Sequence, residues 1–534
     1  MVAQFRERPP ARQRGSTGPR GFRIVVVGAS QARLSGRRRR TGEMVSVSVN
    51  ASRESTRTAL PGWAGHVVLG LIVAIAAYLR FNDLGADSLW RDEIASWEQA
   101  QGTLLEVIAA TAQDNYPPLH NLVLAASMSL LGDGAVALRL PSAILGVANV
   151  FAIYWVSTLI AGRTAGLLSA LLLALSGYHV WYSQEARMYA LLALAATVYA
   201  GSTISFSRSP TAVRGALMLL AGLALLYSHP YGAPTWATIA LAVAVTGFWR
   251  QEPRGPTLAQ WGIPAAATLA LFLPWMWVLV GRAATVNETG FWIAYPTPAF
   301  ILQQLEELAT GPVMLGFLAA AGFAATLRES PPPSANGQAP RFAALSIELG
   351  APAVWLLAWG VVPIVLGVLV SVFSTPVFID RYIIGSLPAF LILAGWGLAR
   401  FATNWIRLTV VLAITTAVSW LGLVTSSPPP REDWRGVASL FADTFTNDAC
   451  VVAPKGGGLS TLRYYYREPI DCSYEVDRAN PLQPSKIRAN LIFVILFGSG
   501  DRGASILGAF PSPPWQVGGE VPFTRLNVVG LIRK

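Results

Sequence analysis

The chain has 534 residues, of which 53% are hydrophobic and only 13% are charged, about half the charged fraction of an ordinary soluble protein. So few charges cannot cover the surface of a soluble fold of this size, and so many apolar residues exclude a largely disordered chain. The net charge of +11 lies almost entirely in residues 1–60, and so it does not indicate a nucleic-acid-binding protein. The two cysteines exclude a disulfide-rich scaffold and a cysteine-based metal cluster. The composition predicts a polytopic α-helical membrane protein.

Residues 1–60 are rich in Arg, Ser, Gly and Pro, which predicts a disordered, basic cytoplasmic tail. The four consecutive arginines from Arg37 to Arg40 are typical of a solvated tail and do not by themselves indicate a nucleic-acid patch. A short strand-like piece at 24–28 is not followed by GxGxxG, so no dinucleotide site is expected. No cleavable signal peptide is visible, because the first long apolar run begins at Trp63.

Eleven apolar runs approach the roughly 20 residues that cross a bilayer as a helix. They are 63–80, 137–160, 164–182, 188–206, 215–231, 232–249, 258–280, 312–327, 352–374, 382–399 and 407–426. The segment 119–131 is apolar but shorter, and we expect it to form a re-entrant or interfacial helix. If the N-terminus is cytoplasmic, every short inner loop contains arginine, as the positive-inside rule requires. An odd number of spans then places the C-terminal region outside.

This topology predicts three parts. The tail 1–60 is followed by a transmembrane domain, 61–426, which has a long first outer loop at 81–136 and a Pro-rich inner linker at 330–340. Residues 427–534 are more polar and predict a small extracytoplasmic α/β domain.

The C-terminal region contains strand-like runs at 450–454, 491–497 and 526–532 and a helix-like run at 433–445. Three glycines at 456–458 follow the first strand, but they lack the GxxxxGK[ST] pattern, which favours a plain loop over a phosphate-binding loop. Cys450 begins a strand and Cys472 ends the Tyr-rich segment beside it. A disulfide between them is expected if this domain lies in an oxidising compartment.

The first outer loop contains the run LWRDEIASW at 89–97. If this run is helical, its residues fall on two opposite faces, with Trp90, Ile94 and Trp97 on one and Asp92, Ser96 and Gln99 on the other. This pattern predicts an interfacial helix with its aromatic side chains in the headgroup zone and Asp92 turned away. Glu93 lies about 100° from Asp92 around such a helix and cannot perform the same task. The alternative is that both acids are solvated and are favoured by the helix dipole.

Three further motifs lie on the same predicted face: YPPLH at 116–120, YHVWYSQEARMY at 178–189 and DRY at 380–382. Glu185 and Arg187 occupy a tight outer turn, where they form either a functional pair or an interfacial ion pair. Arg381 is suited to binding phosphate through its rigid fork of donors, or alternatively it anchors a helix by snorkelling. Histidines such as His120 and His229 face the same side, but no HExxH or i,i+4 pair supports a metal site.

Together these motifs resemble the GT-C glycosyltransferases, and the similarity spans about residues 63–400. The nearest branch is the bacterial glycosyltransferase family 39, similar to the protein O-mannosyltransferases and the lipid A aminoarabinose transferases. The region beginning REDWR at 431–435 also resembles an extra outer domain of some bacterial members. By position, Asp92 matches the family's catalytic first-loop acid, and Glu185 matches the region of a second outer-loop acid. The membrane part contains no lysine, so arginine must replace any phosphate-binding lysine of the relatives.

The resemblance implies transfer of a sugar, with inversion, from a polyprenyl-phosphate donor to an acceptor hydroxyl at the outer face of the cytoplasmic membrane. The acceptor is a protein, lipid or glycan. No nucleotide site is needed, because the lipid phosphate is already a good leaving group. No cofactor is expected, and the alternative is a divalent metal bound by neutral imidazoles near Asp92 and Glu185. Besides the two acids Asp92 and Glu185, we expect Glu93 as a secondary catalytic residue. The expected substrate-binding residues are Arg91, His120, Arg187, Tyr189, His229, Arg381 and Tyr382.

Two other classes of function fit a multispan protein. A transporter or flippase of lipid-linked intermediates usually shows internal repeats and polar groups near the membrane midplane. This sequence has no visible repeat, and its charges cluster at the outer ends of the spans. A non-catalytic membrane scaffold whose outer domain binds a partner is the third class.

Overall fold

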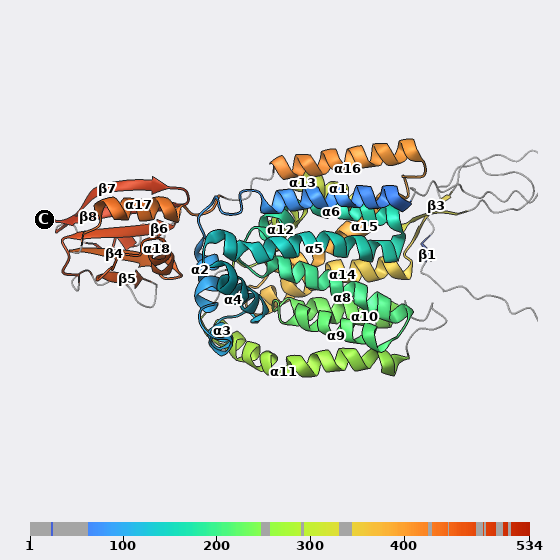
Figure 1. The fold of residues 1–534 in the computed structure, drawn as a ribbon, viewed down its shortest axis with the longest axis horizontal. Helices are drawn as coiled ribbons and strands as arrows, with labels where there is room; N and C mark the ends of the chain where they lie inside the picture. The colour runs from blue at the N-terminus through green and yellow to red at the C-terminus, as the bar shows by residue number, and fades with distance from the viewer. Residues whose placement is uncertain are drawn as a thin grey trace, which may run out of the picture.

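The computed structural model describes residues 23–24, 62–246, 257–289, 293–330, 344–425, 430–446, 448–476, 484, 487–497, 506–510 and 514–534. The predicted disordered tail lies outside the described residues, apart from β1 (Arg23–Ile24), and so does the predicted linker after Ser330. A bundle of helices forms most of the described chain, and a small sheet domain lies beyond one of its ends (Figure 1). The predicted class, a polytopic helical membrane protein with a C-terminal α/β domain, is confirmed.

Seven helices in the described part of the chain are long and apolar enough to cross a membrane. They are α1 (Gly62–Phe81), α5 (Ala135–Ala161), α8 (Tyr189–Arg208), α11 (Leu258–Thr289), α14 (Ala351–Phe373), the continuous pair η2 (Asp380–Ser386) and α15 (Leu387–Ala399), and α16 (Trp405–Thr425). Two bent pairs raise the number to nine if each pair is one span. These pairs are α6 (Arg163–Ala174) with α7 (Gly177–Ser183), and α12 (Pro298–Ala309) with α13 (Pro312–Thr326).

The other two predicted spans are occupied by shorter helices, α9 (Ala212–Leu226) and α10 (Gly232–Thr246), with 15 residues each. A straight crossing needs about 20 residues, so the sequence estimate of eleven spans exceeds what helix length supports. In the first of them the apolar run at 215–231 continues beyond the helix into a turn, which is why sequence alone overestimates its length.

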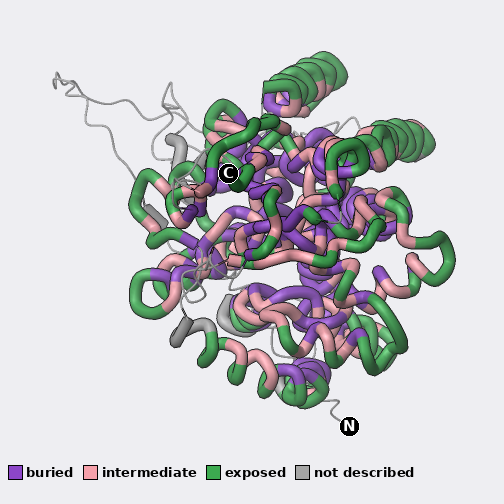
Figure 2. The backbone as a smooth tube through the Cα atoms, turned by 90° about the vertical axis from the view of Figure 1, so that its left-hand side faces the viewer, coloured by how far each residue is buried: buried purple, intermediate pink, exposed green. Residues whose placement is uncertain are grey.

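The outer helices turn large apolar side chains away from the protein. Phe373, Trp277 and Ile406 are 82%, 81% and 78% exposed. The end-on view shows the buried segments concentrated in the middle and exposed stretches on the peripheral helices (Figure 2). Such surfaces are unusual in soluble monomers and fit contact with lipid.

The first loop, which the sequence predicted to be an outer loop, folds into three short helices, α2 (Arg91–Gln99), α3 (Leu104–Thr111) and α4 (Leu119–Leu131). They cover the end of the bundle that faces the C-terminal domain (Figure 1). A small antiparallel sheet, in the order β1, β3 (Ala344–Glu348), β2 (Leu327–Ser330), lies at the opposite end (Figure 1). The first loop therefore lies between the helix bundle and the C-terminal domain.

The C-terminal domain, residues 427–534, is built on a five-stranded mixed sheet in the order β5-β4-β6-β8-β7. Its strands are β4 (Ala449–Pro454), β5 (Ser473–Val476), β6 (Leu491–Phe497), β7 (Trp515–Phe523) and β8 (Leu526–Arg533). Helices α17 (Trp434–Thr444) and α18 (Gly458–Tyr465) pack on one face, where Val451 and Ala453 of β4 join their core. The three predicted strands and the predicted helix are confirmed.

The predicted disulfide is present. Cys450 in β4 and Cys472, just before β5, are bonded, and their Cα atoms are 4.6 Å apart. The two strands run parallel and pair from Val451 and Ser473 onward, which brings the two cysteines together at the start of the pairing. The bond therefore joins the edge strand β5 covalently to its neighbour β4.

Replacing both cysteines with serine should lower the free energy of unfolding of the C-terminal domain by about 3 kcal/mol, because the bond closes a loop of moderate length in the unfolded chain. Pulse proteolysis in increasing urea, read on fragments of this domain, measures the change. Two thiols that react with an alkylating reagent in unreduced, folded protein would contradict the pairing.

Candidate active site

A cavity of about 610 Å³ lies between the helix bundle and the C-terminal domain. Its lining contains five basic residues, Arg91, Arg381, Arg431, Lys455 and Arg525. It also contains three acidic residues, Asp92, Glu185 and Glu432, together with the aromatic side chains of Trp90, Trp181 and Tyr182. The excess of positive charge suits an anionic ligand, and the aromatic faces suit stacking against a sugar or a lipid headgroup.

Asp92 lies in the first turn of α2 and reaches this cavity. Its Oδ2 is 3.5 Å from Nη1 of Arg381, and its side chain remains 34% exposed. Arg187 of the α7–α8 turn fixes the same turn of α2. Its Nη1 donates to the Asp92 carbonyl oxygen at 3.1 Å and to Ser96 Oγ at 2.9 Å. A fixed, accessible carboxylate beside a guanidinium group is thus placed on the cavity wall.

The prediction that Trp90, Ile94 and Trp97 form one membrane-facing side of α2 is wrong. Trp90 is the N-cap of the helix and has an extended backbone, so the helical spacing does not apply to it, and it lines the cavity beside Asp92. Ile94 is fully buried among residues of the loop and bundle, and the ring of Trp97 packs edge-on against Tyr464 of the C-terminal domain at 5.0 Å. The apolar face of α2 therefore contacts protein.

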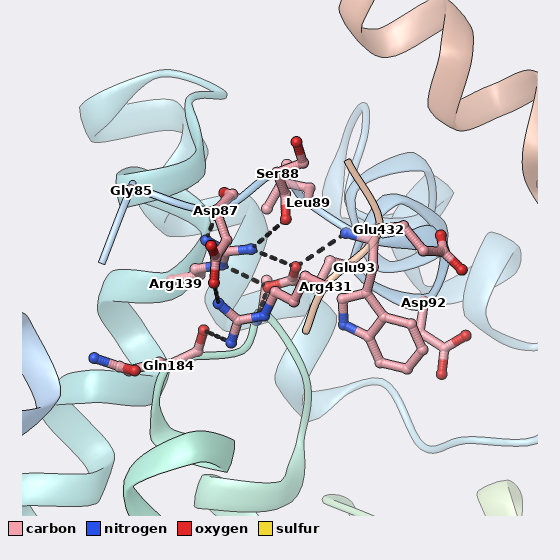
Figure 3. A network of polar contacts seen from close by, with 12 residues as sticks. Gly85, Asp87, Ser88, Leu89, Asp92, Glu93, Arg139, Gln184, Arg431 and Glu432 are labelled. Atoms are coloured by element: carbon pink, nitrogen blue, oxygen red, sulfur yellow. Dashed lines mark hydrogen bonds and ion pairs between the residues drawn. The ribbon is translucent and has the colours of Figure 1, made fainter. Parts of the chain in front are cut away.

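Glu93 points away from Asp92 and forms a fully buried ion pair with Arg139 of α5 (Figure 3). Arg139 Nη2 donates to Oε2 at 2.7 Å, and its Nε donates to Oε1 at 2.8 Å. Oε1 also accepts from the backbone N–H of Ala186 at 2.8 Å. Burial alone would raise the pKa of Glu93, but the charge and hydrogen bonds of Arg139 outweigh it and lower that pKa. Glu93 is therefore held as an anion that joins α2 to the α7–α8 turn.

Glu185, in the α7–α8 turn, is 2% exposed, and its Oε2 has no hydrogen-bond partner in the described part of the chain. Burial raises the pKa of Glu185 to about 7, with Glu93 and Asp92 adding to the rise and the guanidinium groups of Arg431 and Arg381 opposing it. This carboxyl group is thus able to change charge near neutral pH.

Arg381 is the first residue after the buried Asp380 of η2. Tyr182 donates to Asp380 Oδ2 at 3.0 Å, and the Asp380 N–H donates to Gln304 of α12 at 2.9 Å, so the start of η2 is fixed from two sides. The guanidinium group of Arg381 lies 5.7 Å from the ring centre of Trp90 and 5.9 Å from that of Tyr189. These contacts keep it directed at Asp92.

A second, largely apolar cavity of about 320 Å³ lies beside the first, and Tyr116, His229, Tyr231, Leu279 and Tyr382 are among its lining residues. The hydroxyls of Tyr116 and Tyr382 are 2.6 Å apart, and the ring of His229 is 4.7 Å from that of Tyr382. Arg381 lines the first cavity, and Tyr382, the next residue in the chain, lines the second. The two cavities therefore adjoin at this point of η2.

His120, the first-loop histidine, is 1% exposed at the start of α4. Burial and the nearby charge of Arg187 lower the pKa of His120 to about 4, and the pKa of His229 is lowered in the same way. Both imidazoles are therefore neutral at physiological pH. In the described residues, no group of three or more His, Cys, Asp or Glu side chains is arranged to hold a metal ion.

Arg91 turns toward the C-terminal domain. Its Nε donates to Glu432 Oε1 at 3.0 Å, and its guanidinium group stacks 3.9 Å from the ring centre of Phe497. The structure thus brings Asp92, Glu185 and Arg381 to one cavity, places Tyr382 and His229 in the next, and uses Arg91 at the domain contact.

Sequence reasoning missed several charged residues of the site. Arg431, directly after the membrane domain, stacks 4.3 Å from the ring centre of Trp181. It also donates to the Gln184 carbonyl oxygen at 2.9 Å (Figure 3). The dense charges of 431–435 were a signal for it. Arg139 also had a signal, because a charged residue inside an apolar span is usually functional or paired. No sequence signal pointed to Lys455 or Arg525.

The family described as dolichyl-phosphate-mannose-protein mannosyltransferase matches residues 115–278, less than a third of the chain. ArnT from Cupriavidus metallidurans bound to undecaprenyl phosphate superposes with a TM-score of 0.54 at 16% identity, covering 88% of this chain and 98% of that one. The apo form of ArnT gives a TM-score of 0.55 at 17% identity, with the same coverage. This chain has the GT-C fold.

The archaeal oligosaccharyltransferase AglB from Archaeoglobus fulgidus is also similar, with a TM-score of 0.48 at 11% identity over 81% of this chain and 69% of AglB. No protein with a curated description matches the sequence. The family match begins just before YPPLH and ends within α11, so it lies inside the GT-C membrane domain.

Glu93→Gln should destabilise the protein by about 3–5 kcal/mol, because it leaves the Arg139 charge buried without a counter-charge. Asp92→Asn is the matched control, since the partly exposed pair with Arg381 contributes only about 0–1 kcal/mol. Thermal unfolding of both variants in the same detergent measures the difference. Equal melting temperatures for the two variants would contradict a structural role for Glu93, and Glu93 would again be a candidate catalytic residue.

Proposed function

We propose that this protein is a glycosyltransferase that moves a sugar from a polyprenyl-phosphate donor to an acceptor hydroxyl, with inversion at the anomeric carbon. The observation that carries the proposal is Asp92 paired with Arg381 in a basic cavity at the end of an apolar helix bundle. The GT-C fold supports it, since ArnT with this fold was solved with undecaprenyl phosphate. The description of the matching family, a dolichyl-phosphate-mannose-protein mannosyltransferase, points to the same class of chemistry.

In the proposed reaction the acceptor oxygen attacks the anomeric carbon as the bond from that carbon to the phosphate oxygen breaks. Asp92 accepts the acceptor proton, and the lipid phosphate leaves with the electron pair of the broken bond. The transition state resembles an oxocarbenium ion, so positive charge develops on the sugar while negative charge develops on the phosphate. Arg381, 3.5 Å from Asp92, is placed to stabilise the departing phosphate.

The two neighbouring cavities suit the two parts of the donor. The charged cavity accepts the phosphate and sugar, and the apolar cavity beside Tyr382 accepts the first isoprene units of the lipid. Arg187 contributes by holding the backbone of α2, with its guanidinium 5.0 Å from the ring of Tyr116. The proposal requires no cofactor, because the phosphate group of the donor already makes it reactive.

We place the site at the outer face of the cytoplasmic membrane, with the N-terminus cytoplasmic. The disulfide in the C-terminal domain supports this placement, because such bonds persist in oxidising compartments. The arginine distribution supports it as well. Arg163 follows α5 at the end of the bundle away from the first loop, where the positive-inside rule places the cytoplasm.

Asp92→Asn keeps the shape of the side chain but removes the proton acceptor, and it should lower the transfer rate by about 10²–10⁴-fold. The assay uses purified full-length protein in nanodiscs, a radiolabelled polyprenyl-phosphate sugar and an envelope extract as the source of acceptor. Donor binding should be retained in the variant. Transfer near the wild-type rate would reject Asp92 as the base, and no transfer or donor binding by the wild type would reject the proposed function.

Arg381→Ala should weaken donor binding, and Arg381→Lys should recover little of it, because the ammonium group lacks the planar fork of donors. Displacement of a fluorescent polyprenyl-phosphate analogue measures the affinity. Arg407→Ala, at the start of α16, controls for the loss of one arginine elsewhere. Donor affinity unchanged in both Arg381 variants would leave this residue a structural role only.

Donor affinity should decrease as the pH rises through about 7. Glu185, whose pKa is raised to about 7, is neutral below that pH and becomes an anion above it, adding negative charge beside the donor phosphate. The phosphodiester itself keeps a constant charge over this range. Glu185→Gln should remove the pH dependence between pH 6 and pH 8. An equally steep pH dependence in the variant would assign it to another group.

A further inference from the structure

The C-terminal domain supplies one complete wall of the charged cavity. Arg431, Glu432, Lys455, Gly456 and Arg525 belong to it, whereas Asp92, Glu185 and Arg381 belong to the membrane domain. The proposed donor is a lipid, and its phosphate must approach from the bundle, where Arg381 and the apolar cavity lie. The wall formed by the C-terminal domain therefore faces the remaining substrate, across the position of Asp92.

The lining of the cavity contains more basic than acidic side chains. Five basic side chains and three acidic ones line it, an excess of two positive charges. A polyprenyl-phosphate sugar is a phosphodiester with a single negative charge, so it offsets only one of them. Glu432 pairs with Arg91 at 3.0 Å, Asp92 lies 3.5 Å from Arg381, and Arg431 lies 3.4 Å from Asp87 of the first loop. The lining on the side of the C-terminal domain contains two further basic side chains, those of Lys455 and Arg525.

Two loops bring the basic residues of this wall to the cavity. Lys455 directly follows β4 and is itself followed by Gly456 and Gly457, both with positive φ, after which α18 begins with no side-chain cap. The first N–H groups of a helix have no partner within the helix and carry a partial positive charge, which favours an anion. Lys455 and Gly456 of this loop line the cavity and lie directly before the N-terminus of α18.

Arg525 is the second basic residue of this wall. It occupies the tight turn between β7 and β8, where Phe523 pairs with Leu526, and its φ is +57°. This left-handed conformation is one that glycine and asparagine adopt readily and arginine does not. The turn is tied to the start of α17, because the Asp433 N–H donates to the Thr524 carbonyl oxygen at 3.2 Å. An arginine held in this conformation at the cavity points to a functional reason for its presence.

Building on the proposed function, we infer that the wall formed by the C-terminal domain is the acceptor subsite, and that the acceptor carries an anionic group, a carboxylate or a phosphate, bound by Lys455 and Arg525. The acceptor hydroxyl then lies between this wall and the donor, beside Asp92. The C-terminal domain thereby selects the acceptor, and the membrane domain binds the donor.

The lysine content of the chain provides a direct binding test that does not depend on transfer. Lys455 is one of three lysines in the sequence, and the exposed Lys534 at the end of the same domain is a matched control. Full-length protein in nanodiscs is acylated with an amine-reactive ester, and the labelling rate at each lysine is read by mass spectrometry. The probes are inorganic phosphate and glucuronate, with glucose and sodium chloride of equal ionic strength as controls.

Phosphate or glucuronate should slow the acylation of Lys455 several-fold and leave Lys534 unchanged, and the more effective anion identifies the acceptor group. Equal rates at Lys455 with every probe would overturn the inference. Protection of Lys455 by undecaprenyl phosphate alone would also overturn it, because the wall would then belong to the donor phosphate.

A transfer experiment tests the same inference with the natural acceptor. An envelope extract is divided by anion exchange into acidic and neutral fractions and offered to the enzyme with labelled donor. Label should enter the acidic fraction. The double variant Lys455→Gln and Arg525→Gln should raise the KM for that fraction about ten- to a hundredfold, because charge-assisted hydrogen bonds are lost, while donor affinity is retained.

Arg463→Gln is the control variant, since it removes one charge from α18 and its side chain contacts Ser473. The single variant Lys455→Arg, which keeps the positive charge, should leave the KM for the acceptor unchanged. Transfer into the neutral fraction, or an unchanged KM in the double variant, would overturn the inference while leaving the glycosyltransferase proposal standing. Absence of transfer and donor binding in the wild type would instead reject both.

Discussion

The buried ion pair between Glu93 and Arg139 is the constraint on which the site depends. Arg139 also donates to the carbonyl oxygens of Leu84 at 3.1 Å and Ser88 at 2.9 Å, so one side chain of the bundle fixes the chain leading into α2. Glu93 in turn fixes the α7–α8 turn through the Ala186 N–H. Removing either charge would leave the other one buried without a counter-charge, which is strongly destabilising. The position of Asp92 beside Glu185 therefore depends on an intact ion pair.

The same stretch of loop carries the C-terminal domain. Arg435 donates to the Gly85 carbonyl oxygen at 2.9 Å, and the hydroxyl of Tyr465 accepts the Leu89 N–H at 2.6 Å. Residues 84–89 are therefore bound by the bundle from one side and by the sheet domain from the other. Arg431 continues this connection into the cavity, because it stacks on Trp181 and its positive charge lowers the pKa of Glu185, opposing the effect of burial.

Sequence patterns predicted the features that depend on local periodicity. Long apolar runs predicted the crossing helices, and short strand-like apolar runs predicted β4, β6 and β8. The edge strand β5 has four residues and a largely polar sequence, and β7 contains two glycines and a proline, so neither carries a clear strand pattern. These strands form because their neighbours offer backbone partners, which is information that a single segment does not contain.

The site was predictable only where local sequence patterns placed its residues. Asp92, Glu185 and Arg381 stood at the outer ends of predicted helices, and the fold brings them to one cavity. The face of Trp90 was mispredicted because the helix begins one residue later, and the helical angle applies only inside the helix. The partners Arg139 and Arg431 are separated from Glu93 by 46 and more than 300 residues, a distance over which spacing carries no information.

The two walls of the charged cavity belong to units that fold around separate cores. Substitutions in the loops at 455–458 and 524–525 alter one wall without entering the core of the membrane domain. The wall with Asp92 and Arg381 then stays as it is. Proteins that share this architecture can thus diverge by exchanging or reshaping the C-terminal domain, and the same modularity makes domain grafting a practical route to redesign.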